Sequence, residues 1–192
     1  MIVNAMKSVM AAIVAVALVM AYFIATTNLA DSDTGSVPVS TIEVTYQADV
    51  GDFVETELMC LAKNIYFEAG TESDAGKIAV ALVTMNRVAD NRWPSTICDV
   101  TTQGPTWQTQ DGRKFPVKHR CQFSWYCDGK PDDPYPGKNW IKSQKIAETV
   151  YFTNRYDGLV ENATHYHATY VQPNWSRFLD VVTQIDKHIF YR

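Results

Sequence analysis

Glu68 is the residue whose type and setting best fit acid catalysis. It stands in the segment "NIYFEAG", between Phe67 and Ala69. Gly70 predicts a helix end here, and a helix C-terminus disfavours a negative charge. The apolar neighbours also disfavour the ionised form, so both effects should raise the pKa of the carboxyl group. A carboxyl group that stays protonated at neutral pH is what general acid cleavage of a glycosidic bond needs. The alternative is a solvated surface glutamate at a helix end.

Glu72 is a candidate second carboxylate, four residues after Glu68, and Asp74 follows at six. Two carboxylates would permit inverting or retaining hydrolysis of a glycoside. Because Gly70 interrupts the helical pattern, Glu72 and Asp74 also fit the first turn of the next helix, where acidic residues are favoured. That structural role is the alternative for both residues.

The segment "CQFSWYCDG" concentrates aromatic side chains between two cysteines. Phe123 and Trp125 can stack on the flat apolar faces of sugars. Gln122 and Ser124 can form hydrogen bonds with hydroxyl or acetamido groups. The alternative is a core loop held by a disulfide. The two interpretations are compatible, since neighbouring side chains can face opposite ways.

His165, Tyr166 and His167, in "THYHATY", are further candidates for binding a substrate. In a strand the two histidines would face one side and Tyr166 the other. Two such histidines can bind zinc, but a third ligand is needed, and neither His119 nor His188 has supporting spacing. We therefore favour hydrogen-bonding walls of a site and expect no metal ion and no other cofactor.

The elements that position these residues follow a helix-then-strand order. Apolar spacing predicts a helix from an N-cap at Thr56 to Gly70, and a second helix from a capping box at Thr71 to Pro94. A long glycine- and proline-rich loop region follows over 98–139, with short strands around 115–119. A third helix is expected over 140–154, and then two or three short strands. This order is typical of an α+β domain.

The N-terminus predicts export. Lys7 is followed by an uncharged stretch from Ser8 to Ala30, which is long enough to span a bilayer. We therefore expect 1–30 to be an uncleaved signal-anchor helix in the inner membrane, with its first residues in the cytoplasm. A cleaved signal peptide, leaving a periplasmic or other extracytoplasmic protein, is the alternative. Residues 31–52 are expected to be an acidic spacer with a short strand at 41–46, and residues 53–192 a folded domain.

The charge balance and the cysteines indicate the partners and the compartment to expect. The chain has 17 basic and 21 acidic residues; removing Lys7 and the five acids of 31–52 leaves 16 of each sign. Such a neutral domain is not expected to bind nucleic acid. The four cysteines, Cys60, Cys98, Cys121 and Cys127, predict two disulfides in an exported domain. Four cysteines allow three pairings, and the sequence does not choose among them.

Together, four stretches resemble the SleB-type cell wall hydrolases, the family of the spore cortex-lytic enzyme. They are "CLAKNIYFEAGTESDAGKIAVALVTMNRV", "CQFSWYCDG", "ATHYHATYVQPNW" and "QIDKHIFYR", and the resemblance covers about 57–192. It implies a domain similar to lysozymes and lytic transglycosylases. It also implies that the glutamate of "IYFEA", here Glu68, is the key acid. This chain departs from the family at Gly70 and Thr71, where the family has Arg and Gly, and at Asp186, where the family has Gly.

The resemblance implies that peptidoglycan glycan strands are cut between N-acetylmuramic acid and N-acetylglucosamine. A lytic transglycosylase reaction with one acid/base is favoured, and the N-terminal helix is similar to the signal-anchor-release type of phage endolysin. A bacterial envelope enzyme is the alternative setting. Two other classes remain open: a catalytically silent peptidoglycan-binding module, and a zinc-dependent amidase that uses His165 and His167.

Overall fold

The computed structural model describes the backbone of residues 39–192 and the side chains from residue 49 onward. The chain divides into two compact units, 1–45 and 46–192, and the following description concerns the second. The membrane helix predicted for 1–30 lies outside the described residues. Among the helices that are described, none has the length and apolar character needed to cross a membrane.

The first described helix, α2, includes residues 39–52 of the segment that was predicted to be a spacer. It spans Val39–Ala69, so the strand expected at 41–46 is wrong. Thr56 is also not an N-cap: it lies within α2, and its Oγ1 donates to the carbonyl oxygen of Asp52 at 2.8 Å. β-branched residues suggested a strand at 41–46, but such propensity is a weak preference, and a helix that is already formed extends at low cost.

The second helix, α3, spans Asp74–Ala89, and its N-cap is Ser73 rather than the predicted Thr71. Ser73 Oγ accepts from the backbone N–H of Gly76 at 3.3 Å. In a capping box the third helical residue would bond back to the cap's N–H, but Gly76 has no side chain. Asp186 replaces it, accepting from the Ser73 N–H at 2.8 Å. A Cβ at Gly76 would lie 2.5 Å from the Asp186 carboxylate and 2.8 Å from the Glu72 Cβ, so a larger residue there would displace this cap.

A short helix that the sequence did not predict, α4, spans Ile97–Thr101. Its N-terminal N–H groups at Ile97 and Cys98 donate to the carboxylate of Glu57, a buried residue of α2. A disulfide joins Cys60 of α2 to Cys98, so the same two helices are linked covalently. A negative charge at a helix N-terminus is stabilising.

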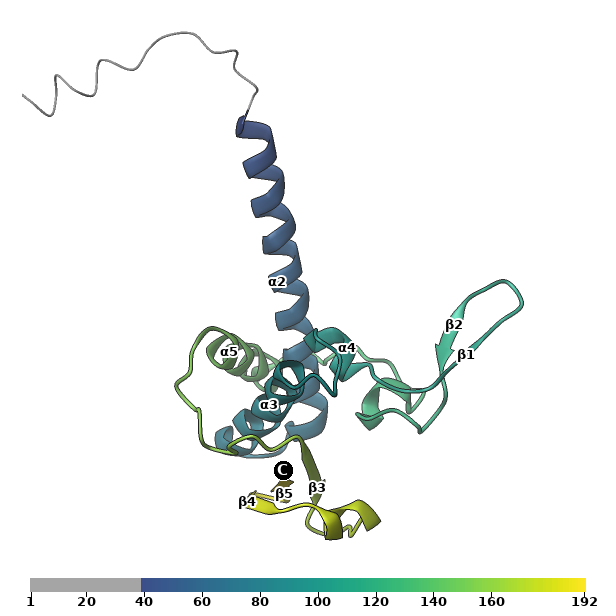
Figure 1. The fold of residues 1–192 in the computed structure, drawn as a ribbon, viewed down its shortest axis with the longest axis vertical. Coiled ribbons are helices and arrows are strands. Elements are labelled where there is room, and N and C mark those ends of the chain that lie inside the picture. Colours follow the sequence, from purple (N-terminus) through teal and green to yellow (C-terminus); the bar gives the residue numbers. More distant parts are fainter. Residues whose placement is uncertain (1–38) are drawn as a thin grey trace, which may run out of the picture. The chain divides into compact units, whose positions relative to one another are not determined.

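The remaining elements are a hairpin, a helix and a small sheet (Figure 1). Strands β1 (Thr106–Gln108) and β2 (Lys114–Pro116) pair antiparallel. The longer helix α5 spans Lys138–Phe152. There are also two short 3₁₀ helices, η1 (Ser124–Cys127) before α5 and η2 (Asn174–Phe178) after it in the sequence. The sheet has the antiparallel order β3-β5-β4, with β3 at His165–Ala168, β4 at Val181–Ile185 and β5 at His188–Tyr191. The predicted mixture of helices and sheet is confirmed, and the C-terminal part has three strands where two or three were expected.

Helix α3 lies at the centre of the packing and contacts α4, α5 and β4. On one side it shares an apolar cluster with α2, α4 and α5 that includes Leu61, Ile65, Ile78, Ile97 and Ile146. On the other side Ala79 and Val83 pack against Phe190 of β5. Because α3 holds α2 and the sheet in one core, residues of α2 and β3 can meet.

The Glu57 contact gives a prediction for stability. Glu57→Ala should lower the free energy of unfolding by about 2–3 kcal/mol, because it leaves two N–H groups of α4 without a charged acceptor. The measurement is chemical denaturation of the oxidised protein. Glu55→Ala, on an exposed neighbour in α2, is the matched control and should change stability by less than about 0.5 kcal/mol. Equal effects of the two substitutions would contradict this role.

Candidate active site

Glu68 lies in the last turn of α2, on the helix face that enters the core. Leu61, Asn64 and Ile65 are fully buried on the same face, three to seven residues earlier. Glu68 itself is partly buried. A stripe of buried residues that contains an amide and a carboxyl group is unusual, because buried polar groups need partners.

Tyr166 is the partner of Glu68. Its hydroxyl donates to Glu68 Oε2 at 3.1 Å. The alternation of β3 turns Tyr166 towards the helices, where its ring packs against His188 and Phe190 at centroid distances of 5.1 and 5.7 Å. Burial raises the pKa of the Tyr166 hydroxyl well above its ordinary value. The hydroxyl therefore keeps its proton and remains a donor to the carboxyl group.

The loop closed by the Cys121–Cys127 disulfide forms another wall. Trp125 stacks on Phe67 at 5.1 Å, and its Nε1 donates to Asn64 Oδ1 at 2.9 Å. Phe123 is 2% exposed and Trp125 8%. These rings offer no open face, so the sugar stacking predicted for them does not fit their burial. The alternative, a disulfide-held core loop, describes them better.

The polar residues of this loop are arranged differently. Gln122 and Ser124 are exposed, and their hydrogen bonding to a substrate stays a prediction. The backbone of Ser124 also lowers the pKa of the Glu68 carboxyl group. The loop thus reaches Glu68 through its main chain, while its two large rings fix the loop in the core.

Arg87 is a site residue that the sequence interpretation missed. It belongs to α3 and is only 5% exposed. Its Nε donates to the carbonyl oxygen of Thr164 at 2.7 Å, just before β3. Its guanidinium lies 4.3 Å from the ring centroid of Trp93 and 5.0 Å from that of Phe123. The available signal was helical spacing: Val80, Val83 and Arg87 share the buried face of α3.

Burial and three stabilising interactions shift the pKa of the Glu68 carboxyl group in opposite directions, and the effect of burial is the larger. Desolvation raises the pKa of the Glu68 carboxyl, whereas the Tyr166 hydrogen bond, the Arg87 charge and the Ser124 backbone each lower it. The net result is a raised pKa, which confirms the predicted direction. The setting therefore favours the protonated form of Glu68 more than water does, and it also contains groups that stabilise the anion.

Glu72 and Asp74 have other contacts. Glu72 Oε2 accepts from the backbone N–H of Lys187, in the β4–β5 turn, at 3.2 Å. Asp74 forms an ion pair with Lys142 of α5 at 2.8 Å. These bonds fit the structural alternative for both acids. The second-carboxylate role of Glu72 receives no support from its contacts.

His165 and His167 lie on the opposite face of β3 from Tyr166. Both rings contact Trp175, at centroid distances of 5.3 and 5.6 Å. His167 donates from Nδ1 to the carbonyl of Ala168 at 2.9 Å and accepts at Nε2 from the Tyr191 hydroxyl at 2.7 Å. The predicted strand geometry is confirmed. Both ring nitrogens of His167 form hydrogen bonds within the sheet.

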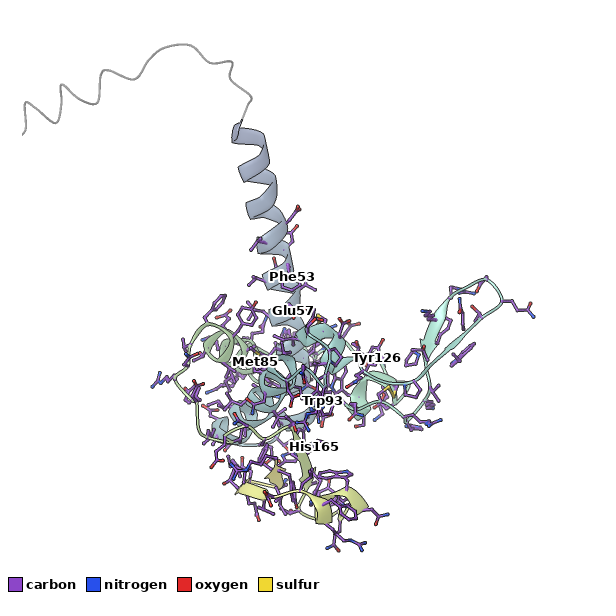
Figure 2. The ribbon with its side chains drawn as sticks, in the orientation of Figure 1. Phe53, Glu57, Met85, Trp93, Tyr126 and His165 are labelled. Carbon is purple, nitrogen blue, oxygen red and sulfur yellow. A yellow bond between two sulfur atoms is a disulfide. The ribbon has the colours of Figure 1, made fainter. Side chains whose placement is uncertain are left out.

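His165 reaches the region of Arg87 through Trp93. The ring centroids of Trp93 and His165 are 5.6 Å apart, and Figure 2 labels the two residues close together. Burial lowers the pKa of His165, and the charges of Arg87 and Arg92 lower it further. A neutral imidazole beside the site can act as a hydrogen-bonding wall.

This chain belongs to the Cell Wall Hydrolase family, whose model matches residues 71–191. The match begins three residues after Glu68 and so does not include that residue. No curated protein matches the chain in sequence.

Two solved structures have the same fold. One is the catalytic domain of the germination-specific lytic transglycosylase SleB from Bacillus anthracis. It is 23% identical, with a TM-score of 0.52, and the match covers 71% of this chain and 93% of that one. The other is the catalytic domain of the Bacillus cereus SleB protein, also 23% identical. Its TM-score is 0.51, with 72% and 91% of the two chains covered.

The Tyr166 contact predicts the pH dependence of wall-degrading activity. The hydrogen bond favours the ionised form of Glu68, so Tyr166→Phe should raise the pKa of Glu68 further. Activity that needs protonated Glu68 should then persist to higher pH, and the alkaline limb of the kcat/KM profile should move upward. Tyr151→Phe, on a partly buried tyrosine of α5, is the control and should leave the limb in place. An unmoved or lowered limb in Tyr166→Phe would count against this role.

Proposed function

We propose that the chain cleaves peptidoglycan glycan strands between N-acetylmuramic acid and N-acetylglucosamine, as a lytic transglycosylase with Glu68 as its single acid and base. The observation that carries the proposal is the carboxyl group of Glu68, held by Tyr166 in a setting that raises its pKa. Membership of the Cell Wall Hydrolase family and the fold shared with a lytic transglycosylase support the substrate class.

In the first step, protonated Glu68 donates to the oxygen that links muramoyl C1 to the next sugar. The C1–O bond breaks, the N-acetylglucosamine part leaves with that proton, and an oxocarbenium-like centre develops at C1. Glu68 is now a carboxylate. The Tyr166 hydrogen bond and the Arg87 charge favour this ionised form, so the two groups stabilise the anion when it is produced.

In the second step, the Glu68 carboxylate takes the proton of the muramoyl C6 hydroxyl group. The C6 oxygen bonds to C1 and closes a 1,6-anhydro ring, and Glu68 is protonated again for the next cycle. Neither water nor a second carboxylate is consumed. The contacts of Glu72 and Asp74 with Lys187 and Lys142 favour this route, because they occupy the acids that would otherwise position a water molecule.

The disulfides support action outside the cytoplasm. Cys60 pairs with Cys98 and Cys121 with Cys127, which fits an oxidising compartment. We further propose that residues 1–30 anchor the protein in the membrane. A phage endolysin and a bacterial envelope enzyme are the two settings that this arrangement would serve.

The direct test is mass spectrometry of the fragments that the oxidised protein releases from purified peptidoglycan. We expect fragments with 1,6-anhydromuramic ends, and a rate at least about 10²-fold lower for Glu68→Gln, since general acid–base catalysis contributes about 10²–10⁴-fold. Gln keeps an oxygen that can accept from Tyr166, so the variant should fold.

Other products would each overturn a part of the proposal. Reducing ends that incorporate labelled water would mean hydrolysis, and would direct attention to Glu72. Free peptides with intact glycan strands would mean an amidase, with His165 and His167 to be tested for a bound metal. Binding without release, by wild type and Glu68→Gln alike, would mean a silent binding module.

A further inference from the structure

The hairpin β1–β2 presents an aromatic pair to solvent. Trp107 and Phe115 are directly opposite each other in the strand register. Their rings stack at 5.2 Å with an angle of 26° between planes, and they are 52% and 39% exposed. Every residue of both strands except Pro116 is exposed. A two-stranded hairpin that packs against no other element gains little stability from burial. The exposure of these two rings is therefore better explained by contact with a ligand.

The hairpin is also basic. Between Gly104 and Cys121 there are four cations and one acid: Arg113, Lys114, Lys118 and Arg120 against Asp111. Asp111 already pairs with Arg113, at 2.8 Å. The described domain as a whole is close to neutral, so this excess is local. It favours an anionic partner and opposes a second copy of the hairpin, since symmetric pairing would bring like charges together.

Main-chain bonds hold the hairpin in a defined form and join it to the site. At its tip, Thr109 N–H donates to the Arg113 carbonyl at 2.9 Å, and Gly112 has a positive φ of 87° that suits the turn. At its base, Gln122 N–H donates to the Gln103 carbonyl at 2.9 Å. Gln122 begins the loop whose next residues, Phe123 and Ser124, border Arg87 and Glu68.

We propose that this hairpin is an accessory binding arm for peptidoglycan, outside the catalytic site. Trp107 and Phe115 would stack on the apolar C–H faces of the sugar rings. The neighbouring cations would attract the carboxylates of the peptides that branch from muramic acid. The choice of peptidoglycan as partner rests on the proposed function. The arm is connected to the loop that borders Glu68, so it can bind the same polymer that enters the catalytic site.

The test is co-sedimentation of the full chain with peptidoglycan sacculi stripped of attached anionic polymers. All variants carry Glu68→Gln, so that binding is measured without cleavage. Adding Trp107→Ala should weaken binding by about tenfold, because it removes one of the two stacking rings. Phe152→Ala, on a 64% exposed aromatic at the end of α5, is the matched control and should bind like its parent.

A charge variant guards against local unfolding of the hairpin. Lys114→Glu leaves the stacked rings in place and should also weaken binding, with a smaller dependence on salt than the parent shows. Unchanged binding in both hairpin variants would overturn the proposal. The proposal would also be overturned if the hairpin variants bound sacculi normally but lost binding to anionic lipid vesicles. The arm would then bind a membrane. If the wild type releases no fragment from peptidoglycan, the proposed glycosidase activity is wrong. The binding measurements use Glu68→Gln variants and do not depend on that result.

Discussion

The burial of one carboxyl group, Glu68, is the constraint on which the site depends. Desolvation disfavours its anion, and three groups from different parts of the chain favour it. Tyr166 comes from β3, Arg87 from α3 and the Ser124 backbone from the loop that Cys121–Cys127 closes. The balance raises the pKa of the carboxyl group while keeping groups that stabilise its anion. A group that must give a proton and then take one needs both properties.

The rest of the domain brings these parts together. Helix α3 packs between α2 and the sheet, and the buried side chains of Phe123 and Trp125 hold the disulfide loop against α2. The β4–β5 turn closes the opposite end: Asp186 bonds to the Ser73 N–H, and Glu72 accepts from Lys187. Asp186 has a positive φ of 48°, a conformation that Asp tolerates better than most residues. The residue at this turn therefore also caps α3.

Local patterns in the sequence predicted much of this structure. Apolar periodicity located only the C-terminal part of α2, after Thr56, and also α3 and α5. Alternation located the C-terminal strands and the opposite facing of Tyr166 and His165. The apolar setting of Glu68 predicted the direction of its pKa shift. What failed depends on contacts between distant segments. The capping of α4 by Glu57 and of α3 by Asp186 links residues 40 and 113 positions apart, which no local pattern reveals. The burial of Phe123 and Trp125 likewise depends on packing against α2 and α4.

The most direct test of the account is a measurement of the Glu68 pKa itself. The carboxyl carbon of Glu68 can be followed by carbon-detected NMR in protein labelled at glutamate, with its signal assigned by its loss in Glu68→Gln. The account predicts a titration midpoint above the ordinary glutamate value of about 4.3. A midpoint at or below that value would contradict it, because Glu68 would then be ionised wherever a neutral acid is required.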